Sequence, residues 1–195
     1  MEHDYYDDAA NVENYSKFTP AHDGALLVDT LSAHLPEGSA VLELGMGPGK
    51  DYKLLCERFK VTGSDFSTAF LDRYRAMDPG AELLQLDART LETERCFDAI
   101  FSNKVLIHLS ADELQQAFMR QHAVLNDGGL IMHSFWNGEG QKKFDGLTLV
   151  YHNEHDLTAM LEDSFDILAL EQHAKMAEGD SIYVVARKKN SKEKP

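Results

Sequence analysis

The chain has 195 residues, 33 of them acidic against 19 lysines and arginines, and so a formal net charge of −14. This length suits one domain with a sizeable core, and 43% hydrophobic with 27% charged residues excludes wholesale disorder. The acidic excess argues against DNA or RNA as partners, because affinity for a phosphate backbone comes largely from lysine and arginine.

Short apolar runs alternate along the chain with longer segments of helical period, which predicts an α/β fold with a buried parallel sheet. Two helices, over residues 4–17 and 22–35, precede the first strand. Seven strands are predicted, over residues 40–44, 60–63, 82–86, 97–101, 129–134, 165–170 and 181–187.

These elements predict a single domain over residues 1–190. Its first part, residues 1–36, is expected to form an N-terminal helical cap, and residues 37–190 to form the core. Residues 191–195 are expected to be a basic, solvated tail.

Two of the predicted helices have recognisable starts. Ser110 and Glu113 have the spacing of a capping box, a hydroxyl at the helix start with a carboxylate three residues later. This helix is expected to stop before Asp127 and to turn its apolar side chains toward the sheet. Polar and acidic side chains at residues 153–156 predict another helix start, where they complement the helix dipole.

The most informative segment is residues 41–51, with the sequence VLELGMGPGKD. An apolar strand leads into three alternate glycines and then a helix, the arrangement by which α/β sheets present backbone N–H groups to a ligand. Asp65 lies 20 positions beyond Gly45, at the end of the second strand, where a carboxylate can accept both hydroxyls of a ribose. The spacing predicts a nucleoside site.

The glycine spacing also bears on which nucleoside binds. NAD-binding turns read GxGxxG and leave room for a pyrophosphate, whereas this one reads GxGxG. Glu43, two residues before the first glycine, would repel a pyrophosphate but suits a ligand with an ammonium group. The pattern favours S-adenosylmethionine (SAM).

Together, residues 40–135 resemble the class I SAM-dependent methyltransferases, small-molecule type. The resemblance implies a Rossmann-like three-layer sandwich with a seven-stranded, mostly parallel sheet, in which the seventh strand is antiparallel and inserted between the fifth and sixth. Its motifs here are the glycine turn, Asp65, Leu86-Asp87-Ala88, residues 97–103 and Gly128-Gly129-Leu130-Ile131.

The resemblance implies roles for the residues of the turn. Gly45, Met46, Gly47 and Gly49 would lie under the methionine part of SAM, with Glu43 as the acidic residue of the motif. The alternative is ordinary turn chemistry, since glycines and acids are common in loops.

The resemblance also assigns residues to the nucleoside. Asp65 would bind the ribose hydroxyls, and Phe66 would lie beside the adenine. Asp87 would read the adenine amino group with the Ala88 backbone alongside, and Asn103 would line the pocket of the methyl donor.

Methyl transfer from a sulfonium can proceed by alignment alone, so a catalytic base is optional. His108, after the fourth strand, is the candidate base, with a turn-packing histidine as the alternative. His133, inside the fifth strand, is expected to be a core residue. Trp136 either lines a substrate pocket or covers the end of the sheet.

Two segments are candidates to close the site. Tyr6 and Tyr15 on the first helix either fold over SAM, as the resemblance implies, or pack as one face of an ordinary amphipathic helix. Residues 137–144 predict a polar loop whose Lys142 and Lys143 either meet an anionic substrate or remain solvated.

No metal site is expected. His152 and His155 are interpreted as surface residues at a helix start, because no HExxH pattern or third ligand accompanies them.

The segment after the fourth strand narrows the acceptor, by the same resemblance. Residues 102–105 read SNKV, neither the Asn/Asp-Pro-Pro-aromatic motif of the related amino methyltransferases nor a cysteine that could attack a pyrimidine. This favours a small-molecule acceptor methylated at O, N, S or C, with S-adenosylhomocysteine (SAH) as the other product. A non-catalytic SAM- or SAH-binding regulatory protein is the alternative. An NAD-dependent reductase would need a Tyr-x-x-x-Lys motif, which the sequence lacks.

The N-terminus and the cysteines bear on location. Residues 1–4 carry neither the basic nor the apolar region of a signal peptide, and no run approaches the ~20 apolar residues that cross a bilayer. Cys56 and Cys96 lack the spacing of a zinc or redox pair. We expect a cytoplasmic protein without membrane contact, and the sequence leaves its oligomeric state open.

Overall fold

The computed structural model describes residues 24–144 and 146–190. The predicted helix over residues 4–17, with Tyr6 and Tyr15, and the basic tail over residues 191–195 lie outside this part. Helix α3 falls within the predicted helix over residues 22–35 and starts after Gly24, which has a left-handed φ of 62°.

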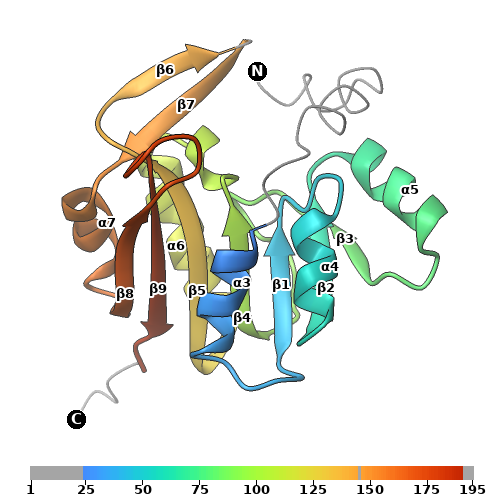
Figure 1. Ribbon diagram of the computed structural model, residues 1–195. Helices are drawn as coiled ribbons and strands as arrows, with labels where there is room; N and C mark the ends of the chain where they lie inside the picture. Colours follow the sequence, from blue (N-terminus) through green and yellow to red (C-terminus); the bar gives the residue numbers. More distant parts are fainter. Residues whose placement is uncertain (1–23, 145, 191–195) are drawn as a thin grey trace.

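One sheet forms the centre of the molecule (Figure 1). Strands β3, β2, β1, β4 and β5 are adjacent and parallel in that order, as a doubly wound sheet requires. Strand β9 runs antiparallel between β5 and β8, which confirms the expected insertion. The strands are β1 Ala40–Leu44, β2 Lys60–Asp65, β3 Leu83–Gln85, β4 Phe97–Asn103, β5 Leu125–Asn137, β6 Gln141–Phe144, β7 Leu147–His152, β8 Phe165–His173 and β9 Ser181–Lys188.

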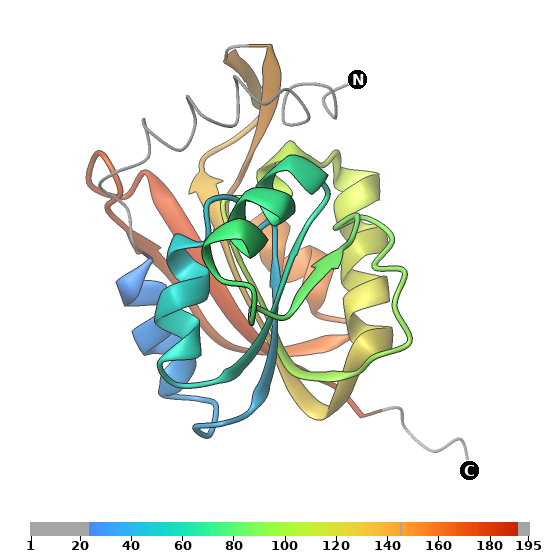
Figure 2. The ribbon, with the colours of Figure 1, turned by 90° about the vertical axis from the view of Figure 1, so that its right-hand side faces the viewer.

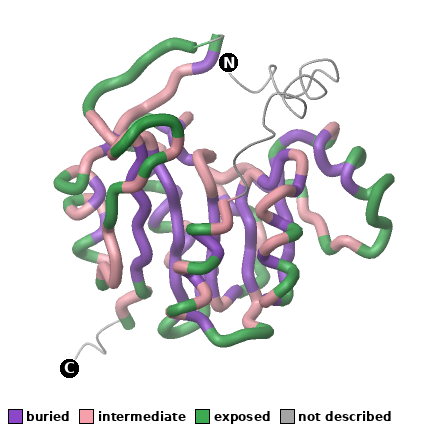
Figure 3. Tube along the Cα trace, in the orientation of Figure 1, coloured by how far each residue is buried: buried purple, intermediate pink, exposed green. Residues whose placement is uncertain are grey.

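Helices cover both faces of the sheet, giving the expected three layers (Figure 2). One apolar core lies between the sheet and helices α3 and α4, and a second between the sheet and helices α6 and α7. Buried residues accordingly concentrate in the central strands (Figure 3). The helices are α3 Ala25–Ser32, α4 Lys50–Cys56, α5 Thr68–Met77, the 3-10 helix η1 Leu106–His108, α6 Ala111–Val124 and α7 Glu154–Leu161.

Both expected helix caps are present. The Ser110 hydroxyl accepts from the Glu113 N–H while the Glu113 carboxylate accepts from the Ser110 N–H. Asn153 and Asp156 form the equivalent box at the start of α7. These bonds satisfy N–H groups that a helix start otherwise leaves without partners.

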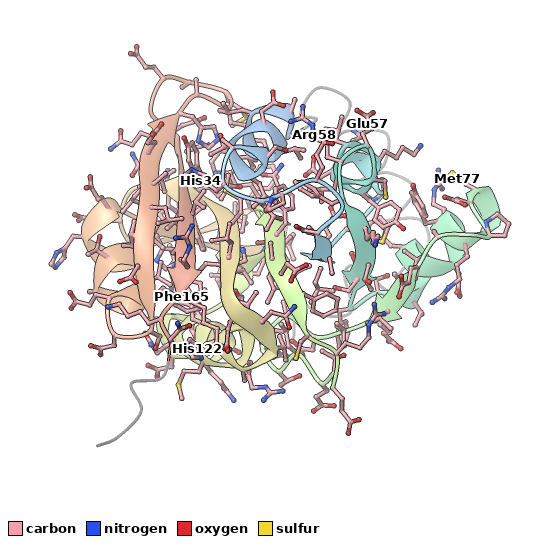
Figure 4. The ribbon with its side chains drawn as sticks, turned by 90° about the horizontal axis from the view of Figure 1, so that it is seen from below. His34, Glu57, Arg58, Met77, His122 and Phe165 are labelled. Atoms are coloured by element: carbon pink, nitrogen blue, oxygen red, sulfur yellow. The ribbon has the colours of Figure 1, made fainter. Side chains whose placement is uncertain are left out.

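At the end of the sheet away from the glycine turn, side-chain contacts join neighbouring elements (Figure 4). The rings of His122 and Phe165 meet edge to face at 5.6 Å, which joins α6 to β8. Arg58 pairs with Asp29 at 2.5 Å and joins the end of α4 to α3.

The fifth strand differs from its prediction. It begins at Leu125, directly after α6, because a left-handed Gly128 with φ 73° lets the strand bulge and then resume its pairing with β4 at Leu130. The prediction began this strand at residue 129, since Asp-Gly-Gly indicates a turn. It also ended the strand too early, because β5 runs on to Asn137.

The predicted polar loop over residues 137–144 is wrong. Residues 141–144 form β6, which pairs antiparallel with β7 in a hairpin, so the part of the chain that the structure describes has nine strands and not seven. All four residues of β6 are exposed, so no hydrophobic alternation marked the strand in the sequence. Left-handed glycines at positions 140 and 146 provide its bends.

Candidate functional site

A cavity of about 570 Å³ opens where the carboxyl ends of the parallel strands meet. This is the edge at which open α/β sheets bind ligands. It brings together residues that the sequence places far apart, namely Gly45, Gly47, Asp65, Phe66, Asp87, Ala88, Asn103 and His108. Three other predicted residues are not part of the cavity wall and lie in or next to the turn after β1, namely Glu43, Met46 and Gly49.

Two glycines of the turn have no room for a side chain. Gly45, with φ 63°, would place a Cβ 2.5 Å from a methyl group of Val105. Gly49, with φ 79°, would place one 2.1 Å from the ring of Tyr74 and is also the residue that starts α4. The turn therefore requires glycine for both its backbone angles and its close contacts.

Asp65 ties the turn to the end of β2. One carboxylate oxygen accepts the Gly47 N–H at 2.8 Å, and the other accepts the Ser67 N–H at 2.9 Å. The side chain is 9% exposed. The two hydrogen bonds fix the carboxylate at the edge of the cavity.

Glu43 is buried beneath the turn, at 3% exposure. Its Oε2 has no hydrogen-bond partner within the part of the chain that the structure describes. Burial raises the pKa of this carboxyl well above its usual range, and the nearby charges of Asp51 and Asp65 raise it further. The floor of the site therefore holds three neighbouring acidic groups.

Asn103, the last residue of β4, belongs to a hydrogen-bond chain. Its amide donates to the Asp51 carboxylate at 2.9 Å, and its oxygen accepts the Ser134 hydroxyl at 2.7 Å. The Ser134 oxygen accepts the Lys104 N–H at 3.1 Å. Because the Asp51 carboxylate can only accept, the NH2 end of the amide must face it, and this fixes the orientation of the Asn103 amide.

The Asp87 carboxylate pairs with Arg89, a residue that the sequence alone did not single out. The guanidinium donates to both carboxylate oxygens through Nε at 3.0 Å and to one of them through Nη2 at 2.5 Å. Arg89 also lies 3.6 Å from Glu113 at the start of α6. A bidentate pair of this kind holds the end of the cavity near β3 in place.

His108 lies in η1 on the cavity wall. Its Nδ1 is 3.2 Å from the carbonyl oxygen of Thr148 in β7. A carbonyl only accepts, so Nδ1 carries the proton and Nε2 is the basic atom of the ring.

Trp136, near the end of β5, is not on the wall of this cavity. It pairs with Ser181 of β9 and with Tyr151 of β7. The ammonium groups of Lys104 and Lys175 lie 4.3 and 5.8 Å from the centre of its ring. Of these two lysines, Lys104 also lines the cavity.

The central part of the chain resembles a known family. The family described as "Methyltransferase domain" matches residues 41–129. The trans-aconitate 2-methyltransferase of Variovorax paradoxus (strain S110) is 36% identical over 101 residues, 50% of this chain and 38% of that protein. The corresponding enzyme of Paracidovorax citrulli (strain AAC00-1) is 34% identical over 119 residues, 57% of this chain and 42% of that protein. The chain spans less than half the length of these curated relatives.

Solved structures match almost the whole chain. The DhpI–SAH complex superposes with a TM-score of 0.76 at 21% identity, over 96% of this chain and 95% of that one. The 1,6-didemethyltoxoflavin-N1-methyltransferase of Burkholderia thailandensis, with that compound and SAH bound, gives 0.73 at 22% identity, over 97% and 91%. These likenesses establish the fold. Residues 41–129 thus match a methyltransferase domain family, and the chain as a whole has the fold of these SAM-dependent methyltransferases.

The residues around this cavity fit SAM, which carries positive charge on its sulfonium and ammonium groups. The charges of Asp51 and Asp65 make the potential at the floor of the site negative, and burial together with these charges raises the pKa of Glu43. Glu43 offers a buried oxygen that has no hydrogen-bond partner in the described chain. The glycine turn lets the backbone approach a ligand closely.

Two histidine interpretations have different outcomes. His133 is fully buried, as expected of a core residue, with Nδ1 2.8 Å from the Ser102 hydroxyl and Nε2 2.7 Å from the Gln121 amide oxygen. The expectation that His152 lies at the surface is wrong, because it ends β7 and packs edge to face on Phe135 at 5.2 Å. The sequence did not show the hairpin that carries His152 inward.

The remaining expectations concern charged side chains and metals. Lys142 and Lys143 are exposed on β6, in agreement with the solvated alternative, and His155 is exposed on α7. Across residues 24–144 and 146–190, no three histidine, cysteine, aspartate or glutamate side chains gather as metal ligands. In the same ranges, no helix is long and apolar enough to cross a membrane.

Proposed function

We propose that this chain transfers a methyl group from SAM to a small-molecule acceptor. The observation that carries the proposal is the bond between Asp65 and the Gly47 N–H, which joins the two cofactor motifs at the edge of one cavity. When bound, SAM supplies an activated methyl group on its sulfonium.

The cavity wall suggests how the chain would hold the nucleoside. Asp65, fixed by two backbone N–H groups, would bind the ribose hydroxyls, and Phe66 would cover the adenine. Asp87 and the Ala88 backbone would contact the adenine edge. Arg89 holds the Asp87 carboxylate in place for this role.

The floor of the site would hold the methionine part. Gly45, Met46, Gly47 and Gly49 form the close-approach turn, with Glu43 as the buried acid behind it. Asn103 lies on the cavity wall with its amide held by two hydrogen bonds, in a position to contact the methyl donor or the acceptor.

The chain's own contribution to the reaction is alignment, exclusion of water and proton transfer. His108, on the cavity wall, would take the acceptor's proton on Nε2 while its Nδ1–H stays on the Thr148 carbonyl. That bond fixes the ring against the hairpin. The hairpin also contributes Leu147 to the wall, where its apolar side chain excludes water.

We infer a small, soluble acceptor. The curated relatives are trans-aconitate 2-methyltransferases, which makes trans-aconitate the first acceptor to test. The net charge of −14 argues against nucleic acid, and the two free thiols, Cys56 and Cys96, favour the cytoplasm. A single domain over residues 1–190, with residues 1–36 as a cap, remains part of this proposal.

Calorimetric titration with SAM, SAH and NADH tests the cofactor. We expect saturable binding of SAM and SAH, weakened at least tenfold (about 1.4 kcal/mol) by Asp65→Ala. Asp72→Ala, which removes an exposed carboxylate that pairs with Arg75 on α5, is the matched control. Binding of NADH alone would refute the proposal.

Turnover separates an enzyme from a regulatory SAM-binding protein. Protein that binds SAH should transfer labelled methyl from SAM to trans-aconitate or to another member of a panel of small metabolites. Tight cofactor binding without transfer to any member would favour the regulatory alternative.

A further inference from the structure

Two lysines from distant parts of the chain converge on its single tryptophan. Lys104 follows β4 directly, and its ammonium lies 4.3 Å from the centre of the Trp136 ring. Lys175 lies in the loop between β8 and β9, and its ammonium is 5.8 Å from the same point. We call these three residues the lysine–tryptophan cluster.

The cluster is held in place from both sides. The Lys104 ammonium donates to the carbonyl oxygen of Phe135, and the Lys104 backbone has a left-handed φ of 60°, which is strained for a residue with a side chain. The loop that carries Lys175 crosses the end of β5 (Figure 1). It is bound there by Asn137, whose backbone N–H and side-chain amide donate to the carbonyls of Asp180 and Gly179 at 2.9 and 2.8 Å.

Both ammonium groups are half-buried and lack a close counter-charge. Among residues 24–144 and 146–190, no carboxylate lies within 4 Å of either group. Asp180, the nearest acidic group of this loop, accepts the backbone N–H groups of residues 175–177 and the Ser181 hydroxyl. Burial and the charge of Lys175 together lower the pKa of Lys104 to about 7, although the charge of Asp180 acts in the opposite direction.

Holding two positive charges out of water without an anion is costly, and the chain has an acidic excess from which to supply one. Structural lysines would be expected to pair with these carboxylates. The cluster therefore has the character of a binding site, in which the counter-charge comes from a ligand.

The position of the cluster complements the cofactor site. Lys104 lines the same cavity as Asn103, whose amide donates to Asp51 on the acidic side. Acidic groups thus gather at the glycine turn, and basic groups gather beyond Asn103. The acidic side suits a cationic methyl donor, and the basic side would repel one.

We propose that Lys104 and Lys175 bind a carboxylate group of the methyl acceptor, with Trp136 as the surface that supports both ammonium groups. This inference rests on the proposed function and names its acceptor class as small carboxylic acids. The donors are two ammonium point charges, whereas phosphate sites commonly use a helix N-terminus or an arginine fork, so a carboxylate fits better.

The single tryptophan allows a direct test, since fluorescence excited at its absorption edge reports on Trp136 alone. The full chain is saturated with SAH and titrated with trans-aconitate, citrate and succinate at constant ionic strength. Trimethyl trans-aconitate, which has no charge, and inorganic phosphate serve as comparison ligands. We expect a saturable change with at least one carboxylate and none with the ester.

Two substitutions then assign the change to the lysines. Lys104→Met and Lys175→Met should each weaken carboxylate binding at least tenfold and leave the affinity for SAH unchanged. Lys142→Met is the matched control, because that ammonium lies 4.8 Å from the ring of Tyr151 on the hairpin. If the strained backbone prevents Lys104→Met from folding, Lys175→Met carries the test.

Four results would overturn the proposal: a chain that binds SAH but shows no saturable response to any carboxylate, tighter binding of phosphate, lysine variants that bind the carboxylate normally, or lysine variants that lose SAH. The last would assign the ammonium groups to the carboxylate of the cofactor. Failure of the unmodified chain to bind SAH is a different result, because it refutes the proposed function itself.

Discussion

Asn103 donates its side-chain amide to the carboxylate of Asp51 at 2.9 Å, across 52 positions of sequence. The Ser134 hydroxyl holds the other end of the amide, so β4, β5 and the first turn of α4 meet at one side chain. Asn103 thus lies between the acidic groups at the glycine turn and the lysine–tryptophan cluster.

Asn103→Asp should therefore destabilise the chain, because it places a second carboxylate against Asp51 and removes a donor. We expect the free energy of unfolding to fall by about 1–3 kcal/mol in urea denaturation at pH 7. Asn126→Asp is the control, since Asn126 donates to Asp98 at 2.7 Å on the exposed surface, where water screens the new repulsion. Equal losses for the two variants would contradict the special role of Asn103.

Gly49→Ala should be costly for steric reasons. The added Cβ would lie 2.1 Å from the Tyr74 ring, on a backbone with φ 79°. Gly38→Ala adds a Cβ to a similar backbone, φ 77°, but meets nothing within 4 Å. Since both variants share the backbone strain, Gly49→Ala should lose about 1–3 kcal/mol more in the free energy of unfolding. Similar denaturation midpoints would show that Tyr74 moves aside freely.

His133 predicts an acid-sensitive fold. Burial lowers its pKa to about 3, whereas an unfolded histidine titrates near pH 6.5. The unfolded chain thus binds more protons between these values, so the free energy of unfolding falls as the pH drops through this window. The contribution of His133 should be about 2 kcal/mol smaller at pH 5 than at pH 7. In His133→Gln, urea denaturation at both pH values should show a correspondingly smaller difference; an unchanged difference would assign the acid sensitivity to other groups.

His108→Gln tests the proposed base. Glutamine can still donate to the Thr148 carbonyl but cannot take a proton at neutral pH. We expect kcat for methyl transfer to fall about 100-fold, with little change in KM or in SAH affinity. A kcat within threefold of the original would leave alignment alone as the chain's contribution.

Carboxylate binding at the lysine–tryptophan cluster should depend on pH. Lys104, with a pKa of about 7, loses its charge as the pH rises above that value, so affinity should fall by up to tenfold per pH unit above pH 7. Its titratable neighbours are Lys175, Asp180 and His173. Lys104→Arg keeps its charge and should give a flat profile in the Trp136 titration. A sloping profile in that variant would assign the titration to one of the neighbours.

Local patterns in the sequence predicted the α/β class and several residues that line the cavity, whereas the order of the strands was implied by the family resemblance. The glycine turn needs particular backbone angles at Gly45 and Gly49, which only glycine adopts easily, and Asp65 must end the next strand. Because these residue types must occupy fixed positions, their spacing can be recognised in the sequence. The caps at Ser110 and Asn153 were predictable for the same reason.

The rest of the site depends on tertiary contacts that leave no such spacing. Lys104 and Lys175 lie 71 positions apart and meet only because β9 returns the loop between β8 and β9 to the end of β5. No sequence pattern predicts the positive φ of Lys104, because lysine rarely adopts this conformation. Charged residues in β6 likewise concealed a strand that is exposed along its whole length.

The sheet topology also sets an order of assembly on the ribosome. β8 joins the sheet through β9 alone, and β9 occupies the open edge of β5, although it is synthesised 44 residues after β5 ends. During translation, β5 therefore waits with an unpaired apolar edge until residue 188 has left the exit tunnel. A chaperone that shields nascent strands would find its target there, and a premature stop before β9 would release a chain prone to strand-to-strand aggregation.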